Sequence, residues 1–426
     1  MKYHRVPAVS VAVIKAGKLE WTAAWGTLGA DDTKTADANT MFQAASISKP
    51  VTALAALHMA QNGNFALDDD VNTTLKTWKV PAFNFPGKVT LRELLSHSAG
   101  LTVHGFGGYA AGEPVPTVPQ ILDGVPLSNS KPIRVDVAPG TVWRYSGGGY
   151  TVIQQLLIDK SGMSFPDLMD RMVLKRIGMT HSAYSQPLAA LYQGNAARAH
   201  LNNGTMIKGR WHTYPEMAAA GLWTTPSDLA KFLIEVRSAS RGESNKVIDR
   251  AMAQEMLKIQ MGSYGLGLGI EGEGAERWFG HGGSNEGFKC DMRMYLESGD
   301  GVVVMTNGDS GSALAREIER AVADAYGLPG LKPEVKKVVT VSPADLARLA
   351  GEYSLEGLKL RVSVKGGGIT VLSSIQAEPA EFLPQSETEF FPTVDGLGNI
   401  TFAIGPDGKV NEFSLFGSTA KRASGR

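Results

Sequence analysis

Hydrophobic and polar positions change their spacing several times along the chain. Residues 8–27 alternate on either side of a tight turn, which predicts two β-strands. Residues 50–61 are rich in helix-forming side chains, with Pro50 near the first turn and Gly63 as a stop, which predicts a helix. Helical patterns also occur at residues 89–101, where the helix should end near Gly100, and at 150–162, 164–179 and 229–239.

The last of these helices carries a clear start signal. Thr225 is expected to be the N-cap, Pro226 the first helical residue and Asp228 the partner that closes a capping box. Between the second and third helical segments, residues 102–140 are rich in glycine and proline and are expected to form loops.

From residue 262 the pattern changes to strands separated by glycine-rich turns, followed by a helix over 312–327. Strands therefore open the module, helices fill its middle, and strands with a helix close it. This order predicts an α+β fold, in which an antiparallel sheet built from both ends of the module is flanked by helices and interrupted by an inserted helical region. Residues 331–343 resemble a linker, and the alternating remainder predicts a small antiparallel β-barrel or meander. We expect one domain over 1–332, and a linker with the barrel domain over 333–426.

Composition limits the classes of partner. The chain has 42 Lys plus Arg and 42 Asp plus Glu, so its formal net charge is zero, which is not typical of a nucleic-acid groove or a membrane-attracting patch. No apolar run reaches the roughly 18 residues of a membrane span. A small-molecule substrate is expected. A homo-oligomer is compatible with the sequence, and so is either a cytoplasmic location or a periplasmic or secreted one after removal of a leader.

Cysteine and histidine give little sign of a bound group. Cys290 is the single cysteine, which excludes an intrachain disulfide. None of the eight histidines shows a metal-binding spacing, so we expect no metal and no cofactor. His97 is expected to have a structural role at a helix end.

The candidate chemistry begins with Ser46 and Lys49. Their spacing places both side chains on one face of a helix, where an amine could activate the hydroxyl. The alternative is a serine N-cap followed by an exposed lysine. The same four-residue pattern also occurs at Ser128–Lys131 and Ser418–Lys421, but only Ser46 leads directly into a long apolar helix.

Three motifs in order give the chain a family resemblance. "SISK" at 46–49, "YSG" at 145–147 and "HGG" at 281–283 resemble the serine β-lactamase and penicillin-binding-protein superfamily, nearest to its class C and family VIII esterase branches. "LRELLSHSAGL", "WRYSGGGY", "GLWTTPSDLAKF" and "GHGGSNEGF" extend the similarity over about residues 1–330. The tail resembles the lipocalin-like barrel of some members.

The resemblance implies a role for each matching residue. Ser46 would be the acylated nucleophile and Lys49 its proton acceptor or electrostatic partner. Tyr145 would be a general base that later activates water, and His281 stands where many relatives have the lysine of a Lys-Thr-Gly triplet. The backbone N–H groups of Ser46 and Ser284 would form the oxyanion hole.

Whether Lys49 or Tyr145 takes the serine proton stays open at this point. Free tyrosine has a pKa of about 10, so a base at pH 7 needs a depression of about 3 pH units, or about 4 kcal/mol. One ammonium about 4 Å away, at an effective dielectric constant of 20, supplies about 4 kcal/mol. A charged Lys49 could therefore nearly suffice to activate Tyr145.

Two departures from the family pattern bear on the substrate, which would lie against Gly147, Gly283 and Ser284. Gly147 stands where penicillin-recognising relatives usually carry asparagine, and His281 is not a permanent cation. Both departures favour small uncharged esters, cleaved through an acyl-enzyme on Ser46. The alternatives are a D-amino-acid-specific peptidase or carboxypeptidase, a weak β-lactamase, and a non-catalytic penicillin-binding-like receptor.

Overall fold

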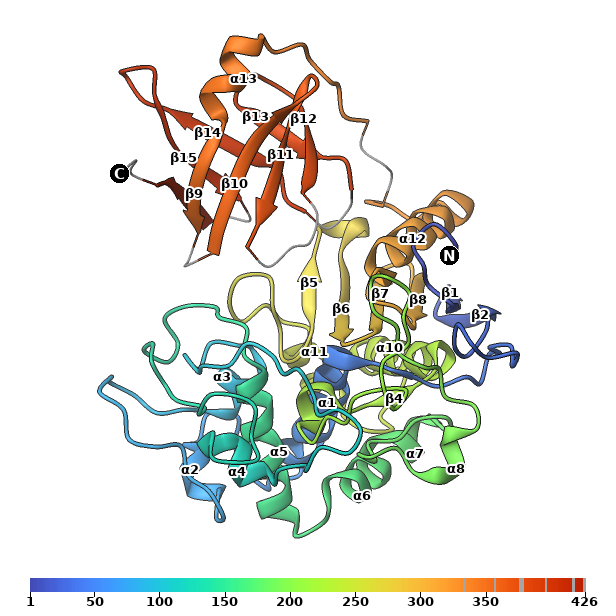
Figure 1. Cartoon of the computed structure of the whole chain (residues 1–426). Helices are drawn as coiled ribbons and strands as arrows, with labels where there is room; N and C mark the ends of the chain where they lie inside the picture. The colour runs from blue at the N-terminus through green and yellow to red at the C-terminus, as the bar shows by residue number, and fades with distance from the viewer. Residues whose placement is uncertain (332–334, 356–357, 375–378, 395–396, 416–417, 424–426) are drawn as a thin grey trace. The chain divides into compact units, whose positions relative to one another are not determined.

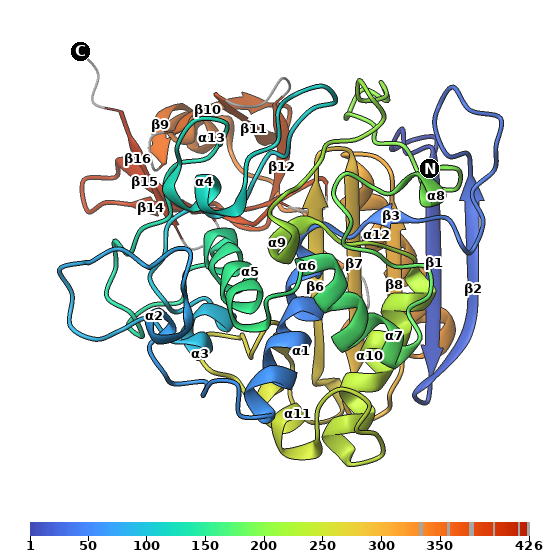
Figure 2. The ribbon, with the colours of Figure 1, turned by 90° about the horizontal axis from the view of Figure 1, so that it is seen from below.

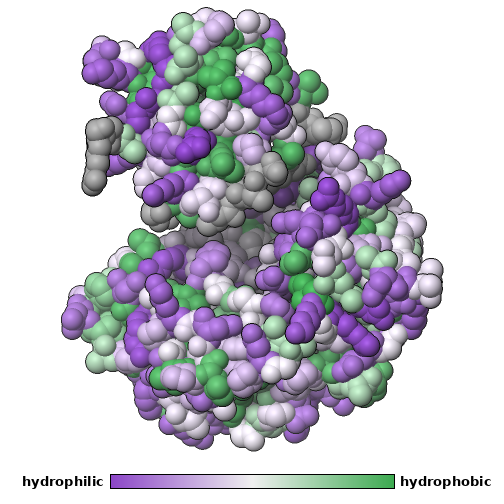
Figure 3. Space-filling model, viewed as in Figure 1, coloured by the Kyte–Doolittle hydropathy of each residue, from purple (hydrophilic) through white to green (hydrophobic). Residues whose placement is uncertain are grey.

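The computed structural model describes residues 1–331, 335–355, 358–374, 379–394, 397–415 and 418–423. The chain divides into two compact units, Met1–Lys332 and Pro333–Arg426, and each has its own hydrophobic core (Figure 1). On the face of the first unit in Figure 3, hydrophilic and hydrophobic side chains are interspersed.

A six-stranded antiparallel sheet forms the centre of the first unit, in the order β2-β1-β8-β7-β6-β5; Figure 2 shows the strands from β2 to β6 side by side, and Figure 1 shows β5 next to β6. Its strands are β1 (Ala8–Lys15), β2 (Lys18–Gly26), β5 (Gly269–Glu271), β6 (Trp278–Asn285), β7 (Phe288–Tyr295) and β8 (Gly301–Thr306). The N-terminal hairpin thus pairs with β8 from the far end of the unit, which confirms the predicted sheet built from both ends. A separate two-stranded sheet joins β3 (Phe42–Gln43) and β4 (Trp223–Thr224).

Helices cover both faces of this sheet. One face packs on α12 (Gly311–Tyr326), and the other packs on α10 (Pro226–Arg241) and the rest of the inserted region. Because both faces are covered, strand β1 is buried at every position from Ala8 to Ile14, and all of these residues except Ser10 are apolar. The remaining helices of the unit are α1 (Ser48–Gln61), α2 (Val71–Thr74), α3 (Leu91–Leu95), α4 (Val118–Asp123), α5 (Gly147–Ser161), α6 (Phe165–Met169), α7 (Lys175–Ile177), α8 (Ala190–Gln193), α9 (Met217–Ala220) and α11 (Arg250–Met256), together with 3₁₀ turns η1 (Ala45–Ile47) and η3 (Gly274–Glu276) and the π-helical turn η2 (Asp170–Leu174).

The structure corrects several predicted boundaries. Helix α3 ends at Leu95 instead of near Gly100, because His97 adopts a left-handed conformation with φ of 60° that a helix cannot continue. Helix α4 interrupts the stretch expected to be loop. The first strand of the glycine-rich segment begins at Gly269, and the residues from 262 to 268 form only isolated bridges.

The predicted capping box at α10 is only half formed. The Thr225 side chain accepts a hydrogen bond from the Asp228 backbone N–H, as expected of an N-cap. The Asp228 carboxylate does not return to Thr225; it accepts from the His181 backbone N–H at 2.7 Å and the Ser182 hydroxyl at 2.9 Å. A tertiary contact has therefore replaced the local one.

The second unit is a closed, eight-stranded antiparallel barrel preceded by α13 (Pro343–Leu349). Its strands are β9 (Gly351–Leu355), β10 (Leu358–Lys365), β11 (Gly368–Ser373), β12 (Ala380–Pro384), β13 (Glu389–Pro392), β14 (Ile400–Ile404), β15 (Val410–Leu415) and β16 (Ser418–Arg422), and β16 pairs with β9 to close the barrel. Tyr353, Phe402 and Phe413 pack against one another inside it. The lipocalin-like character of this barrel stays a prediction.

Within the described ranges, no helix is both long and apolar enough to span a bilayer. The same residues contain no cluster of three or more His, Cys, Asp or Glu side chains that could hold a metal ion.

The aromatic interior of the barrel generates a stability prediction. Phe413 is fully buried against Tyr353 and Phe402, so Phe413→Ala should lower the free energy of unfolding of the barrel by about 3–5 kcal/mol. Val364 in β10 is 42% exposed, and Val364→Ala should change the free energy by less than about 0.5 kcal/mol. Denaturant titration measures both. Equal losses in the two variants would contradict this description of the barrel core.

Candidate active site

Ser46 lies on the short turn η1, directly before helix α1. Ala45, the residue before it, has a φ of 48°, a strained conformation for a residue other than glycine. Ser46 is partly exposed, whereas Ala45 and Ile47 on either side are buried. The turn therefore presents one hydroxyl at the surface of an apolar core.

Lys49 lies beneath that hydroxyl and is 2% exposed. Its Nζ is 3.0 Å from Ser46 Oγ and 2.9 Å from the Ala219 carbonyl oxygen in α9. The predicted i, i+3 pairing of Ser46 with Lys49 is therefore present in the structure. Lys49 is buried, in contrast to the exposed lysine of the alternative interpretation.

Burial dominates the electrostatics of Lys49. Removal from water lowers the pKa of this amine from its ordinary value to about 7, because neither of its two partners carries a charge to offset the desolvation. A neutral amine matches these partners, since it can donate to the Ala219 carbonyl and accept a hydrogen bond from the Ser46 hydroxyl. Near neutral pH, Lys49 can thus act as a proton acceptor.

Tyr145 lies beside the same two groups. Lys49 Nζ is 4.8 Å from the centre of the Tyr145 ring, and the Tyr145 and Ser46 side chains share a hydrogen bond. Burial raises the pKa of the Tyr145 phenol above its ordinary value. This is the reverse of the depression that a tyrosine base would need. The sequence argument assumed a charged Lys49, but desolvation favours the neutral form of both side chains.

Strand β6 forms one edge of the site and carries Gly283 and Ser284. A Cβ atom on Gly283 would lie 2.3 Å from the Ala44 carbonyl oxygen and 2.4 Å from Cys290 Sγ, so only glycine lets β6 come this close to the segment before Ser46. Strand β5 pairs with β6 only as far as Gly280, which leaves the edge beyond it without a strand partner in the described structure.

The register of the β6–β7 hairpin sets the direction of the Ser284 N–H group. Asn285 pairs with Phe288 across a two-residue turn, and Ser284 pairs with Lys289. In such hairpins the closing pair is hydrogen-bonded and the next pair is not, so the Ser284 N–H points away from β7, toward the open edge. The Ser46 N–H, in the first turn of a helix, also lacks an intrahelical partner.

His281 lies on the same strand and is neutral. Desolvation, which is complete at Nε2, and the nearby Lys49 lower the pKa of His281 to about 3. Its Nδ1 donates to the Gly282 carbonyl oxygen, so Nε2 carries the lone pair. Nε2 is buried, and no described residue is its hydrogen-bond partner. His281 therefore offers a hydrogen-bond acceptor, not the cation of a lysine.

Gly147 is closely covered. A Cβ atom at this position would lie 3.1 Å from both the His104 carbonyl oxygen and the Phe106 ring. The residues of the 102–107 loop thus occupy the space next to Gly147 that a longer side chain would need.

His97 holds the turn that carries Tyr145, a role wider than the helix-end one expected for it. Its carbonyl accepts from the Arg144 N–H at 2.7 Å, and its Nδ1 accepts from the Ser146 N–H at 3.1 Å. The residues on both sides of Tyr145 are thus bound to one histidine, whose ring lies 4.2 Å from the Tyr145 ring. The sequence gives no signal of this, because it depends on the left-handed backbone of His97.

The structure thus brings Ser46, Lys49, Tyr145 and His281 into one cluster. The other two Ser-x-x-Lys patterns lie on other elements. Ser128 bonds to Ser130 in a loop of the first unit, and Ser418 begins β16 of the barrel.

Comparisons with known proteins agree with this fold. The model of the beta-lactamase family matches residues 1–327. Penicillin-binding protein 4* of Bacillus subtilis is 22% identical over 87% of this chain and 84% of its own length. A D-aminopeptidase of Brucella anthropi is 24% identical over 73% of this chain and 58% of its own length. The structure of an octameric penicillin-binding protein homologue from Pyrococcus abyssi superimposes with a TM-score of 0.65 at 21% identity, over 99% of this chain and 97% of that one.

The close approach at Gly283 generates a prediction with a matched control. Gly283→Ala should force β6 away from Ala44 and reduce the rate of Ser46 labelling by a fluorophosphonate by about a hundredfold, since displacements near 1 Å cost that much. In Gly282→Ala, the new Cβ lies 3.3 Å from the Asp291 carboxylate and 3.8 Å from the Cys290 carbonyl oxygen, so it makes no contact as short as those at Gly283 and labelling should change little. Mass spectrometry of the Ser46 peptide measures the rates. Similar rates in the two variants would show that the approach of β6 does not matter.

Proposed function

The chain belongs to the beta-lactamase family, and we propose that it is a serine hydrolase that cleaves small carboxylic esters through an acyl-enzyme on Ser46. The observation that carries the proposal is the contact between Ser46 Oγ and an amine whose pKa burial has lowered to about 7. A serine hydroxyl is a weak nucleophile unless a base lies within hydrogen-bond reach, and Lys49 meets that requirement in both distance and pKa.

In the acylation step, the Ser46 hydroxyl gives its proton to the Lys49 lone pair as Oγ bonds to the ester carbonyl carbon. The carbonyl oxygen becomes an oxyanion, which the N–H groups of Ser46 and Ser284 would stabilise by hydrogen bonds. When the carbon–oxygen ester bond breaks, the proton held by Lys49 passes to the leaving alkoxide and restores the neutral amine.

Tyr145 is proposed to act as a neutral phenol. Because burial raises its pKa, Tyr145 keeps its proton at neutral pH and can donate a hydrogen bond to the leaving-group oxygen. In deacylation, a water molecule gives a proton to Lys49 and attacks the acyl carbon, and the proton then returns to Ser46 Oγ.

The preference for uncharged esters rests on two positions. Position 147 is glycine and therefore has no side-chain amide to bind an acylamino group. His104 and Phe106 cover the space that such a side chain would occupy. His281 presents a lone pair in place of a cation, and a lone pair repels a substrate carboxylate. Both features count against β-lactam and carboxypeptidase substrates.

A D-amino-acid aminopeptidase is the second candidate. The same lone pair on His281 Nε2 can accept a hydrogen bond from the free ammonium group of an amino-acid substrate. One of the relatives is a D-aminopeptidase, which is consistent with this activity.

Three substrates tested in parallel separate these functions: p-nitrophenyl butyrate, D-alanyl-p-nitroanilide and nitrocefin. We expect the highest kcat/KM for the ester and a loss of at least about a thousandfold in Ser46→Ala, because the nucleophile is removed. Peptide mass spectrometry of protein quenched during turnover and then digested should show an acyl adduct on the Ser46 peptide.

A preference for the D-anilide would replace the ester hypothesis with the aminopeptidase. Turnover that Ser46→Ala leaves unchanged would refute both candidates. Absence of turnover and of any adduct on Ser46 would favour a non-catalytic receptor.

A further inference from the structure

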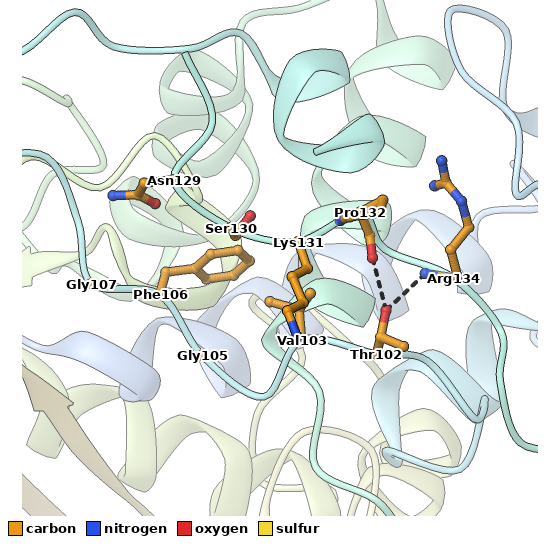
Figure 4. Close-up of a pocket in the computed structure, with 10 residues that line it drawn as sticks. All are labelled: Thr102, Val103, Gly105, Phe106, Gly107, Asn129, Ser130, Lys131, Pro132 and Arg134. Atoms are coloured by element: carbon orange, nitrogen blue, oxygen red, sulfur yellow. Dashed lines mark hydrogen bonds between the residues drawn. The ribbon is translucent and has the colours of Figure 1, made fainter. Parts of the chain in front are cut away.

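A pocket of about 440 Å³ lies on the 102–107 loop, in the first unit (Figure 4). Pockets of this volume are typical of small-molecule sites. Its walls are two chain segments, 102–107 and 129–134, and Figure 4 labels the ten residues that line it.

Hydrogen bonds fix both ends of this pocket. At one end, Thr102 Oγ1 donates to the Pro132 carbonyl at 3.1 Å and accepts from the Arg134 N–H at 2.8 Å, as Figure 4 shows. At the other end, the Asn129 side chain donates to the Gly108 carbonyl at 2.8 Å. The two walls are therefore held apart at a set distance, and the pocket is formed before any ligand arrives.

The charges that line the pocket are of one sign. None of the ten lining residues is acidic. The Arg134 guanidinium already has hydrogen-bond partners, because it donates to the backbone carbonyls of Leu122 and Ile133. The Lys131 ammonium has neither an ion-pair nor a hydrogen-bond partner among the described residues, and its side chain extends toward Val103 (Figure 4). The Lys131 ammonium is therefore available to a ligand, and the pocket wall next to it consists of Val103, Phe106 and Pro132.

We propose that this pocket binds a small molecule with an apolar body and a carboxylate, the body against Val103 and Phe106 and the carboxylate on Lys131. Charge complementarity selects an anion, and the apolar wall selects a hydrocarbon or aromatic body over a bare ion. None of Ser46, Lys49, Tyr145 and His281 lines this pocket, and the proposal does not depend on the proposed function.

The pocket shares its loop with the turn after Tyr145. The carbonyls of Thr102 and Val103 accept from the Ser146 hydroxyl at 2.8 and 3.3 Å, and the His104 carbonyl accepts from the Gly147 N–H at 2.9 Å. A ligand in the pocket therefore contacts the loop that also holds this turn.

The test uses ligand-observed NMR with 4-phenylbutyrate and its neutral analogue 4-phenylbutanamide. Both are titrated into Ser46→Ala protein, so binding is followed without turnover. We expect the carboxylate to bind more tightly than the amide. Lys131→Met should raise the Kd of the carboxylate about fivefold and leave that of the amide unchanged, as removal of a partly exposed ion pair predicts. Lys131→Arg should retain most of the affinity.

A second variant tests the location of the site. A Cβ atom on Gly105 meets nothing within 4 Å, so Gly105→Phe should fold normally and fill the pocket, and both ligands should lose binding. A Cβ atom on Gly194, which lies outside the pocket, also meets nothing within 4 Å, so Gly194→Phe is the control. It should bind both ligands with the affinity of the Ser46→Ala protein. Equal affinity for carboxylate and amide, or unchanged binding in Gly105→Phe, would overturn the proposal.

Discussion

The removal of one amine from water is the constraint on which this site depends. A change in the pKa of Lys49 from its ordinary value to about 7 corresponds to roughly 5 kcal/mol of lost preference for the charged form. Among the residues that the structure describes, no carboxylate contacts Nζ to restore that preference; its partners are a hydroxyl and a carbonyl. The same desolvation that makes burial of Lys49 costly therefore lowers its pKa, and this lets the amine accept a proton near neutral pH. The unfolded chain binds this proton more tightly, so the contribution of Lys49 to stability should increase as pH rises from about 7 to about 10.5.

The scaffold supports this amine from segments far apart in the sequence. Helix α9 supplies the Ala219 carbonyl to Lys49, His97 fixes the turn that carries Tyr145, and Gly283 lets strand β6 reach the segment before Ser46. Each contact is made largely by backbone atoms. Backbone donors and acceptors held by a sheet and short helices are rigid, and rigid groups need little rearrangement when charge develops in a reaction.

The sequence pattern predicted those features that depend on the spacing of residues along one helix or strand. The helical spacing of Ser46 and Lys49 was sufficient to place them together, and the strands at both ends of the unit were sufficient to predict the sheet. The neutral state of Tyr145 was missed because it depends on the desolvation of two side chains at once. The role of His97 and the pocket beside Lys131 depend on loops that pack far from their sequence neighbours, which spacing along the chain does not reveal.

The most direct test is the pKa of Lys49 itself. Protein labelled with ¹³C-lysine would be titrated by NMR, and the Lys49 side-chain signal assigned by its absence in Lys49→Met. The account predicts one lysine that titrates with a midpoint near 7, well below the other lysines. A Lys49 signal that titrates near 10, together with the exposed lysines, would show that the amine is charged at neutral pH and would contradict its role as the base.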